Sequence, residues 1–486
     1  MLKQRAFQAT LWSGADIFLR QALQFTVTIA LARLLTPSDF GTIALLALFI
    51  GIASALLDGG FSAALIQRQD VDHADESTVF WFNLGIGAVM ALCLCAVAPA
   101  IASFYGVPVL RPLMVVMALV VFVSALGAIH STLLAKRLDI RTQMKVGLLA
   151  TIASGGTAAV MAWKGYGVWA LAAQAVVMAS VTTSLLWIFN PWRPAWLFSH
   201  ISVRKLFGFG SYHLASILLE IIYGHLYTIL IGKLYSTREL GLYNNAANTQ
   251  QMPGTFLAGV LARVAFPMFS EAAHDKTKLR RGMQLSIRGM MLLHVPSILG
   301  IAALAEPLVR TLFGTQWLPA VPILRVLCLA GLWFPLHVIN LHVLMAQGHS
   351  RLMFRLEVTK KILGVSLIAA GAFYGVMGIA WSQVVFSVVA LAINSHYTRK
   401  FLDYGVAAQL RDYAPVLSIA IPMAAVVYAI DFYWHPSPLM GLAVLSLFGA
   451  LLFFGLAWLF RLDALHDVAL LFRRAPNGAS DSHGVA

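Results

Sequence analysis

The sequence predicts an all-α integral membrane protein with about 14 transmembrane helices, which form two pseudo-symmetric six-helix lobes plus two C-terminal helices. The first observation is composition: 60% of the 486 residues are apolar and 11% are charged, whereas soluble domains carry about 25% charged residues. The second is that apolar runs of about 20 residues, each long enough to cross a bilayer, recur along the chain. The third is that motifs of the first half return in the second half.

The apolar runs give the expected helices in order, with Pro, Gly and charged residues between them. The expected spans cover residues 13–34, 41–66, 79–104, 111–135, 146–163, 167–189, 207–232, 241–268, 285–305, 318–345, 355–374, 378–398, 413–431 and 438–460. The last two have no counterpart in the first half, so we expect them to be an addition to a duplicated bundle.

Internal repeats indicate the duplication. The string Leu-Thr-Pro-Ser-Asp-Phe-Gly at Leu35–Gly41 is echoed by Tyr-Ser-Thr-Arg-Glu-Leu-Gly at Tyr235–Gly241, and each has an acid two residues before its glycine. The segment Pro99–Gly106 returns as Pro307–Gly314. Two further echoes pair Pro112 with Pro322 and Arg141 with Arg351. Duplicated bundles with a site near the midplane are a common architecture of transporters.

The segment Asn190–Pro194 marks the boundary between the lobes, because Pro, Trp and Arg interrupt the apolar pattern there. The expected organisation is an N-terminal six-helix lobe at 1–190, a cytoplasmic linker at 191–206, a second six-helix lobe at 207–400, helices 13 and 14 at 401–472 and a disordered tail at 473–486.

The distribution of Lys and Arg predicts the orientation. With the N-terminus inside, the inner loops and tails hold about 25 of the 34 basic residues. This bias predicts an even number of spans with both termini in the cytoplasm. It also explains most of the net charge of +14 and argues against nucleic-acid binding, because the basic residues form no continuous face.

Two arginines inside expected spans are candidates for a cavity that attracts an anionic group, because a charge within the bilayer is costly. Arg20 lies four residues after Asp16, so it either pairs with that carboxylate on one helix face or projects into a cavity. Arg263 precedes Pro267. Its guanidinium either clamps a phosphate bidentately or reaches the cytoplasmic headgroups.

Two carboxylates inside spans allow similar alternatives. Glu220 lies about midway along the seventh span, where it either has a functional role or pairs with a partner such as Arg263. Asp58 precedes Gly59 and Gly60. It either holds a proton or cation beside an unwound segment or caps a helix break.

Amides crowd the start of the eighth span, at Asn244, Asn245, Asn248, Gln250 and Gln251. This many amide side chains should not face lipid, where no water satisfies them. They either hydrogen-bond sugar hydroxyls in a water-filled vestibule or lie buried between the lobes.

Enzyme signatures are missing: the chain has no Gly-x-Ser-x-Gly string, Walker phosphate loop or His-rich metal cluster. Cys93, Cys95 and Cys328 fall in apolar spans without metal-site spacing. We therefore expect no enzymatic activity, no metal and no cofactor.

Several strings together resemble a known family. They are Leu31–Gly41, Gly60–Arg68, Ile231–Lys233 with Leu240–Asn244, Phe266–Ser270, and Ala305–Pro307 with Phe313–Gly314 and Trp317. Over about residues 8–430 the chain resembles the Wzx-type oligosaccharide flippases, in the branch for colanic-acid-like or xanthan-like exopolysaccharide. That family belongs to the multidrug/oligosaccharidyl-lipid/polysaccharide exporter superfamily.

The resemblance implies a MATE-like bundle in the bacterial inner membrane that moves an undecaprenyl-diphosphate-linked oligosaccharide to the periplasmic leaflet by alternating access of its lobes. It implies membrane lipid and a polysaccharide polymerase complex as candidate partners, and a monomeric transport unit. Arg20, Arg263 and the amides Asn244, Asn245, Asn248 and Gln250 would then bind substrate, and Glu220 and Asp58 would balance charge or carry a coupling ion. Many relatives have an Asp where Tyr227 stands, so no carboxylate role transfers to that position.

Three alternatives stay open. A cation-coupled multidrug-type extruder of the same fold could use Asp58 and Glu220, but Arg20 and Arg263 would repel cationic cargo. A membrane glycosyltransferase needs long outer loops bearing catalytic groups, and the longest loop between expected spans is about 17 residues. A passive scaffold in a polysaccharide assembly complex is the third.

Overall fold

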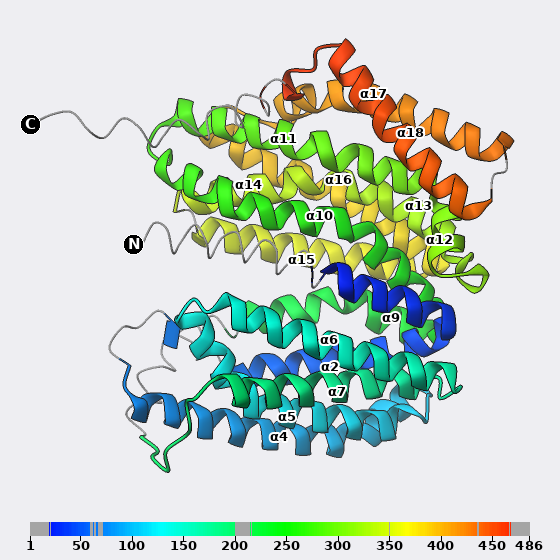
Figure 1. Ribbon diagram of the computed structural model, residues 1–486. Coiled ribbons are helices and arrows are strands. Elements are labelled where there is room, and N and C mark those ends of the chain that lie inside the picture. The colour runs from blue at the N-terminus through cyan, green and yellow to red at the C-terminus, as the bar shows by residue number, and fades with distance from the viewer. Residues whose placement is uncertain are drawn as a thin grey trace, which may run out of the picture. The chain divides into compact units, whose positions relative to one another are not determined.

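A computed structural model describes residues 19, 21–58, 62, 65–66, 71–199, 214, 216–348, 350–434, 437–465 and 467. Within these ranges every regular element is a helix (Figure 1). The chain divides into two compact units, Met1–Gly241 and Leu242–Ala486. The all-α prediction is thereby confirmed.

The first unit is a bundle in which α5 packs against both α4 and α7, and α6 packs against α7. A helix over residues 21–34 precedes the named elements. These are α2 (Pro37–Asp58), α4 (His73–Tyr105), α5 (Leu110–Lys136), α6 (Ile140–Trp163), α7 (Val168–Phe189), α9 (Leu226–Leu234) and the beginning of α10 (Thr237–Glu271).

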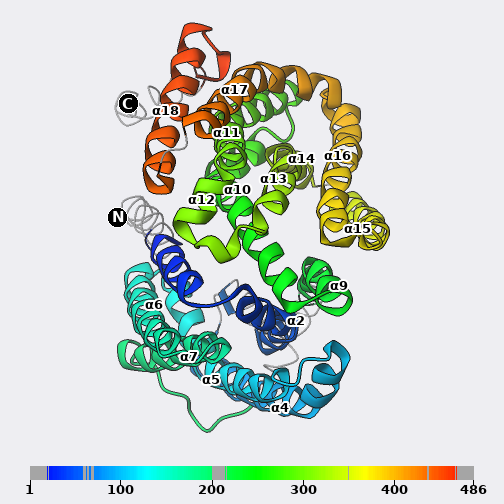
Figure 2. The ribbon, with the colours of Figure 1, turned by 90° about the vertical axis from the view of Figure 1, so that its right-hand side faces the viewer.

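The second unit is built around α11, which contacts α13, α14 and α17 (Figure 2). Its elements after α10 are α11 (Lys276–Ala303), α12 (Ala305–Leu312), the 3₁₀ turn η1 (Thr315–Trp317), α13 (Ala320–Gly331), α14 (Phe334–Ala346), α15 (Ser350–Ala372), α16 (Gly375–Leu402), α17 (Val406–Trp434) and α18 (Pro438–Leu459).

Eleven helical segments in the described part of the chain are long and apolar enough to cross a membrane. The other three expected spans coincide with helices as well, at residues 21–34, α10 and α15. A bundle of many membrane-spanning helices is therefore confirmed, while the number of 14 spans stays a prediction.

The sequence echoes fall at equivalent positions of equivalent helices. Pro112 is the third residue of α5 and Pro322 the third residue of α13, in a first turn where the missing N–H of proline costs no helical hydrogen bond. Arg141 is the second residue of α6 and Arg351 the second residue of α15. These two echoes therefore mark the beginnings of corresponding helices.

Glycines end the corresponding helices in both halves. Gly106 follows α4 with a φ of 67°, and its N–H bonds to the last turn of that helix. Gly314 lies one residue beyond the last turn of α12 with a φ of 101°. L-residues with a side chain rarely adopt positive φ, so a glycine is favoured at both ends.

Two expected spans are interrupted helices. The span expected at 318–345 consists of α13 and α14, which meet at Leu332 and Trp333. Pro335 supplies no N–H to continue the ladder of hydrogen bonds from α13, so the helix restarts there. The seventh span, Ser216–Leu234, has a turn at His225 before α9.

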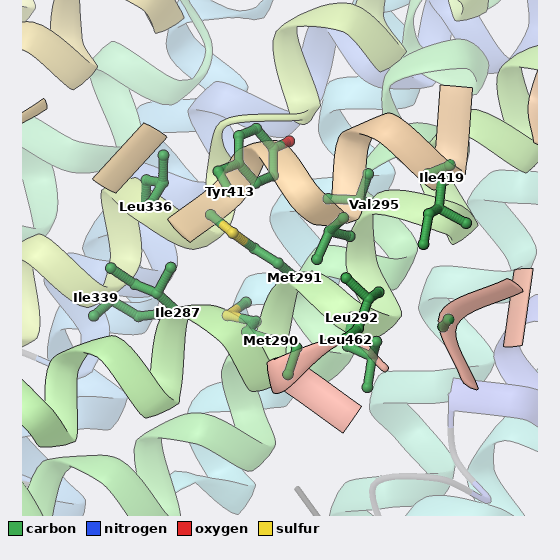
Figure 3. Close-up of a cluster of buried hydrophobic side chains, with 14 of the residues drawn as sticks. Ile287, Met290, Met291, Leu292, Val295, Leu336, Ile339, Tyr413, Ile419 and Leu462 are labelled. Carbon is green, nitrogen blue, oxygen red and sulfur yellow. The ribbon is translucent and has the colours of Figure 1, made fainter. Parts of the chain in front are cut away.

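The core of the second unit lies along α11. Ile287, Met291 and Val295 of this helix are fully buried and pack with Leu336 of α14 and Tyr413 of α17 (Figure 3). Lipid tails are as apolar as these side chains, so close packing rather than exclusion of water stabilises their contacts.

The first part of the expected linker packs on the first unit. The indole N–H of Trp81 donates to the carbonyl of Ala195 at 2.8 Å, and Ser77 Oγ accepts from the Ala195 N–H at 3.0 Å. Trp196 stacks on Trp81 with 4.5 Å between ring centroids. Residues 200–206 of the linker and the expected tail at 473–486 lie outside the described residues. The lobe boundaries expected from the sequence stay a prediction.

Candidate functional site

The two copies of the repeated string meet each other. The first turns of α2 and α10 cross within the unit Met1–Gly241, and the hydroxyls of Ser38 and Thr237 share a hydrogen bond of 2.8 Å. A methyl group on Gly41 would overlap the carbonyl oxygen of Thr237, and a methyl group on Gly241 would overlap the carbonyl oxygen of Pro37. The contact is reciprocal, as expected for two copies of one motif related by a pseudo-two-fold axis.

The acidic residue of each repeated string, Asp39 or Glu239, forms a capping box at the start of its helix. Asp39 Oδ2 accepts from the N–H of Thr36 at 2.9 Å, and Thr36 Oγ1 accepts from the Asp39 N–H at 3.3 Å. Ser236 and Glu239 make the same pair of bonds at 3.4 and 3.2 Å. Each pair satisfies backbone donors that the first helical turn leaves unpaired. The repeated acid therefore fixes where each crossing helix begins.

The two candidate carboxylates, Asp58 and Glu220, lie on separate helices of the first unit. Asp58 is half-buried and is the last residue of α2, while Glu220 is exposed on the segment Ser216–Leu234. Gly59, Gly60 and Arg20 lie outside the described residues.

The amides of α10 divide between two faces of the helix. Asn244 is half-buried and Asn248 is exposed, and their spacing of four residues places them on one face. Gln250 is 9% exposed and packs against Gly331 of α13, where a methyl group would overlap its Nε2. Asn245 is half-buried, and its buried Oδ1 accepts no hydrogen bond within the described chain. Gln251 is exposed and lies three residues after Asn248, so Asn244, Asn248 and Gln251 form a polar stripe.

Arg263 belongs to α10, and its side chain lies outside the described residues. Asn248 and Arg263 are separated by 15 residues, a little over four helical turns, so they lie about 22 Å apart along the helix. The structure therefore does not bring this arginine next to the amide stripe.

Sequence reasoning missed a charged cluster centred on Arg288 of α11. Its guanidinium contacts Asp412 of α17 at 2.6 Å and Asp467 at 3.2 Å. The Tyr404 hydroxyl donates to Asp412 Oδ2 at 2.6 Å, and Gln284 Nε2 donates to the same oxygen at 3.4 Å. Arg288 falls inside the expected span 285–305, so the rule that selected Arg20 and Arg263 would also have selected it.

Burial raises the pKa of the Tyr404 phenol, and the hydrogen bond to Asp412 raises it further. Tyr404 therefore stays protonated and donates at every physiological pH. On the neighbouring exposed residue Asp403, the hydrogen bond from Lys276 at 2.6 Å lowers the carboxyl pKa. The two acids thus have different roles, Asp412 within a packed network and Asp403 at the surface.

Three named relatives match most of the chain. The teichuronic acid biosynthesis protein TuaB of Bacillus subtilis is 28% identical over 78% of this chain and 79% of its own length. The succinoglycan biosynthesis transport protein ExoT of Rhizobium meliloti is 27% identical over 76% of each chain. The lipopolysaccharide biosynthesis protein WzxC of Escherichia coli is 25% identical over 80% of each chain.

Solved structures show the same fold. The lipid II flippase MurJ in an inward closed conformation matches with a TM-score of 0.74 at 14% identity, covering 94% of this chain and 100% of that chain. An inward-facing MATE family multidrug transporter matches with a TM-score of 0.64 at 16% identity, covering 80% of this chain and 96% of that chain. The MATE-like architecture that the family resemblance implied is thus confirmed.

The family model described as polysaccharide biosynthesis protein matches residues 30–322, which is more than half of the chain. This range includes both copies of the repeated string and the beginning of α13. The chain therefore belongs to the polysaccharide biosynthesis protein family, as its resemblance to the Wzx-type flippases predicted.

Proposed function

We propose that this protein is a flippase that moves lipid-linked oligosaccharide repeat units from the cytoplasmic to the periplasmic leaflet for exopolysaccharide, capsule or O-antigen synthesis. One observation carries the proposal: a chain of the polysaccharide biosynthesis protein family has the fold of membrane transporters. ExoT is named a transport protein and MurJ a flippase, and both names support a transport function.

Physical chemistry explains why such a protein is needed. A sugar chain with a charged linkage cannot cross about 30 Å of hydrocarbon unaided. A bundle of two rocking lobes can offer a polar cavity to each leaflet in turn. An undecaprenyl diphosphate carrier is the form of substrate that we propose, with a single chain as the transport unit and a polysaccharide polymerase complex as partner.

The lipid tail needs a different surface from the sugars. The second unit has an apolar cavity of about 250 Å³ between α11, α12, α17 and α18, lined by residues such as Pro296, Met423, Leu445 and Phe453. Helices α17 and α18 are the two that the first half does not repeat. We propose that this apolar surface accommodates the polyprenyl tail while the head group crosses.

Deletion of the gene tests the proposal. In a strain without a redundant flippase, export of the polymer should stop, and lipid-linked repeats should accumulate on the inner leaflet. Accessibility of the sugars to a membrane-impermeant glycosidase or lectin in spheroplasts would report the leaflet. Normal polymer in the deletion strain would contradict the proposal. Normal polymer together with altered sensitivity to cationic drugs would favour the multidrug extruder of the same fold.

Arg20 and Arg263 are proposed to attract the diphosphate, with Asn244 and Asn248 bonding sugar hydroxyls and Glu220 and Asp58 balancing the charge or carrying a coupling ion. We propose Asn245 and Gln250 as further ligands of the sugar hydroxyls. The packing of Gln250 against Gly331 of α13 also fits a purely structural role.

Substitution of Arg263 separates a phosphate ligand from a headgroup anchor. Arg263→Ala and Arg20→Ala should each lower export about tenfold or more at normal membrane abundance, because loss of one charge-assisted contact costs about 1.5–3 kcal/mol. Arg263→Lys should retain partial export, since ammonium keeps the charge but not the bidentate geometry. Full complementation by both alanine variants would show that these arginines only reach headgroups.

A further inference from the structure

The second unit has a polar cavity of about 550 Å³ at the end where α11 and α17 begin and α18 ends. Arg280, Gln284 and Arg288 follow one another at intervals of four residues on α11, so they form one stripe along its wall. Arg411 and Asp412 line it from the second turn of α17. The cavity thus collects three guanidinium groups.

The charges in this cavity are unequally paired. Arg288 contacts Asp412 at 2.6 Å and Asp463 at 3.6 Å, which are the two acids that line the cavity, and Asp467 at 3.2 Å. Arg280 and Arg411 have no ion-pair partner among the residues that the structure describes. Asp403, on which Arg280 also acts at longer range, is already paired with Lys276. Two arginines in one pocket without ion pairs of their own favour an anionic ligand.

One of these arginines is held in place. The guanidinium of Arg280 lies 5.8 Å from the ring centroid of Tyr404, a distance at which the ring attracts the cation. The Tyr404 hydroxyl is bonded to Asp412 at 2.6 Å, which fixes the ring itself. Arg280 is therefore positioned before any ligand arrives, and positioning a ligand group in advance favours binding.

We propose that Arg280 and Arg411 bind the phosphate of an anionic phospholipid, which enters this cavity from the cytoplasmic leaflet. The cytoplasmic placement follows from the basic run Lys276–Arg281 at the start of α11. Basic pockets between membrane helices on that side suit phosphate headgroups. The apolar side chains of Val416 and Leu462 also line the cavity, and they suit the glycerol end of a lipid better than a free ion.

Purified protein in detergent tests the site through its thermal unfolding midpoint. Phosphatidylglycerol should raise the midpoint of the wild type, and phosphatidylcholine should not. The double variant Arg280→Gln, Arg411→Gln should need at least about tenfold more phosphatidylglycerol for the same shift, because two charge-assisted contacts are lost. Arg281→Gln is the matched control: it removes the same charge one residue along α11 and does not line the cavity, so it should respond like the wild type.

The outcomes distinguish the sources of phosphate. An equal response of all variants to phosphatidylglycerol, or no response of the wild type, would overturn the site. A shift with inorganic pyrophosphate alone, lost in the double variant, would assign the cavity to a free phosphate and overturn the lipid. The unliganded midpoint of the double variant should fall only slightly, through loss of the Arg280 contact with the Tyr404 ring, since Arg288 and its acids are untouched. The result does not depend on the flippase function, so either can fail alone.

Discussion

Gly41→Ala and Gly241→Ala should each lower polymer export at least about tenfold. In both variants the new methyl group would overlap a backbone carbonyl oxygen of the crossing helix, that of Thr237 or Pro37. A side chain could turn aside, but a carbonyl moves only with its helix, so α2 and α10 would have to separate. Overpacking of this kind costs about 1–3 kcal/mol or more, and 1.4 kcal/mol changes an equilibrium tenfold. The hydrogen bond between Ser38 and Thr237 would be lost as well.

Control variants exist on other helices of the first unit. Gly85 of α4 and Gly156 of α6 have no atom within 4 Å of an added methyl group, and alanine is the better helix former. Gly85→Ala and Gly156→Ala should therefore export polymer like the wild type. Complementation of the deletion strain, normalised to membrane abundance by immunoblot, is the measurement. Wild-type export by Gly41→Ala at normal abundance would show that the crossing is not needed.

Much of the fold could be predicted because apolar runs, prolines and glycines indicate the same helices. Apolar runs mark helices regardless of their partners, and Pro112 with Pro322 or Gly106 with Gly314 mark helix beginnings and ends in both halves. These signals depend on backbone chemistry within a few residues. They are therefore visible in sequence alone.

The reciprocal crossing could not be predicted from the same string. The sequence shows that Leu35–Gly41 and Tyr235–Gly241 are copies, but it does not say that the copies touch, because that contact joins residues 199 positions apart. The cap at Asp39 is different: Thr36 and Asp39 have the spacing of a capping box, so the local pattern could have indicated it. The contact between the copies depends on tertiary packing, which the pattern of residues does not encode locally.

The candidate site was less predictable for a different reason. Gln250 was grouped with Asn244 by composition, although six residues at 100° each turn it about 240° around α10 from Asn244. The helical period could have separated the two residues. Arg288 was overlooked although it stands within an expected span, and its acids come from α17 and the segment after α18, far along the chain.

Arg288→Ala should destabilise the second unit by roughly 1–3 kcal/mol, whereas Lys276→Ala should have little effect. The side chains of Arg288 and Asp412 are 26% and 12% exposed, so removing the arginine leaves a partly buried carboxylate without its cation. The pair of Lys276 with Asp403 joins the first turn of α11 to the end of α16, but its side chains are 53% and 71% exposed, and exposed pairs contribute about 0–1 kcal/mol. Thermal unfolding of purified protein in detergent compares the two.

A double-mutant cycle separates the loss of the pair from the cost of the unpaired acid. Asp412→Leu combined with Arg288→Met removes both charges and fills their space with apolar side chains. Replacing a buried ion pair in this way is often neutral or stabilising. The double variant should therefore be less destabilised than the sum of its single variants, with a coupling of about 0.5–3 kcal/mol. Tyr404 would lose its acceptor in any variant without Asp412, so Tyr404→Phe belongs in the cycle. Strict additivity of Arg288→Met and Asp412→Leu would show that the contact at 2.6 Å contributes nothing to holding α17 on α11.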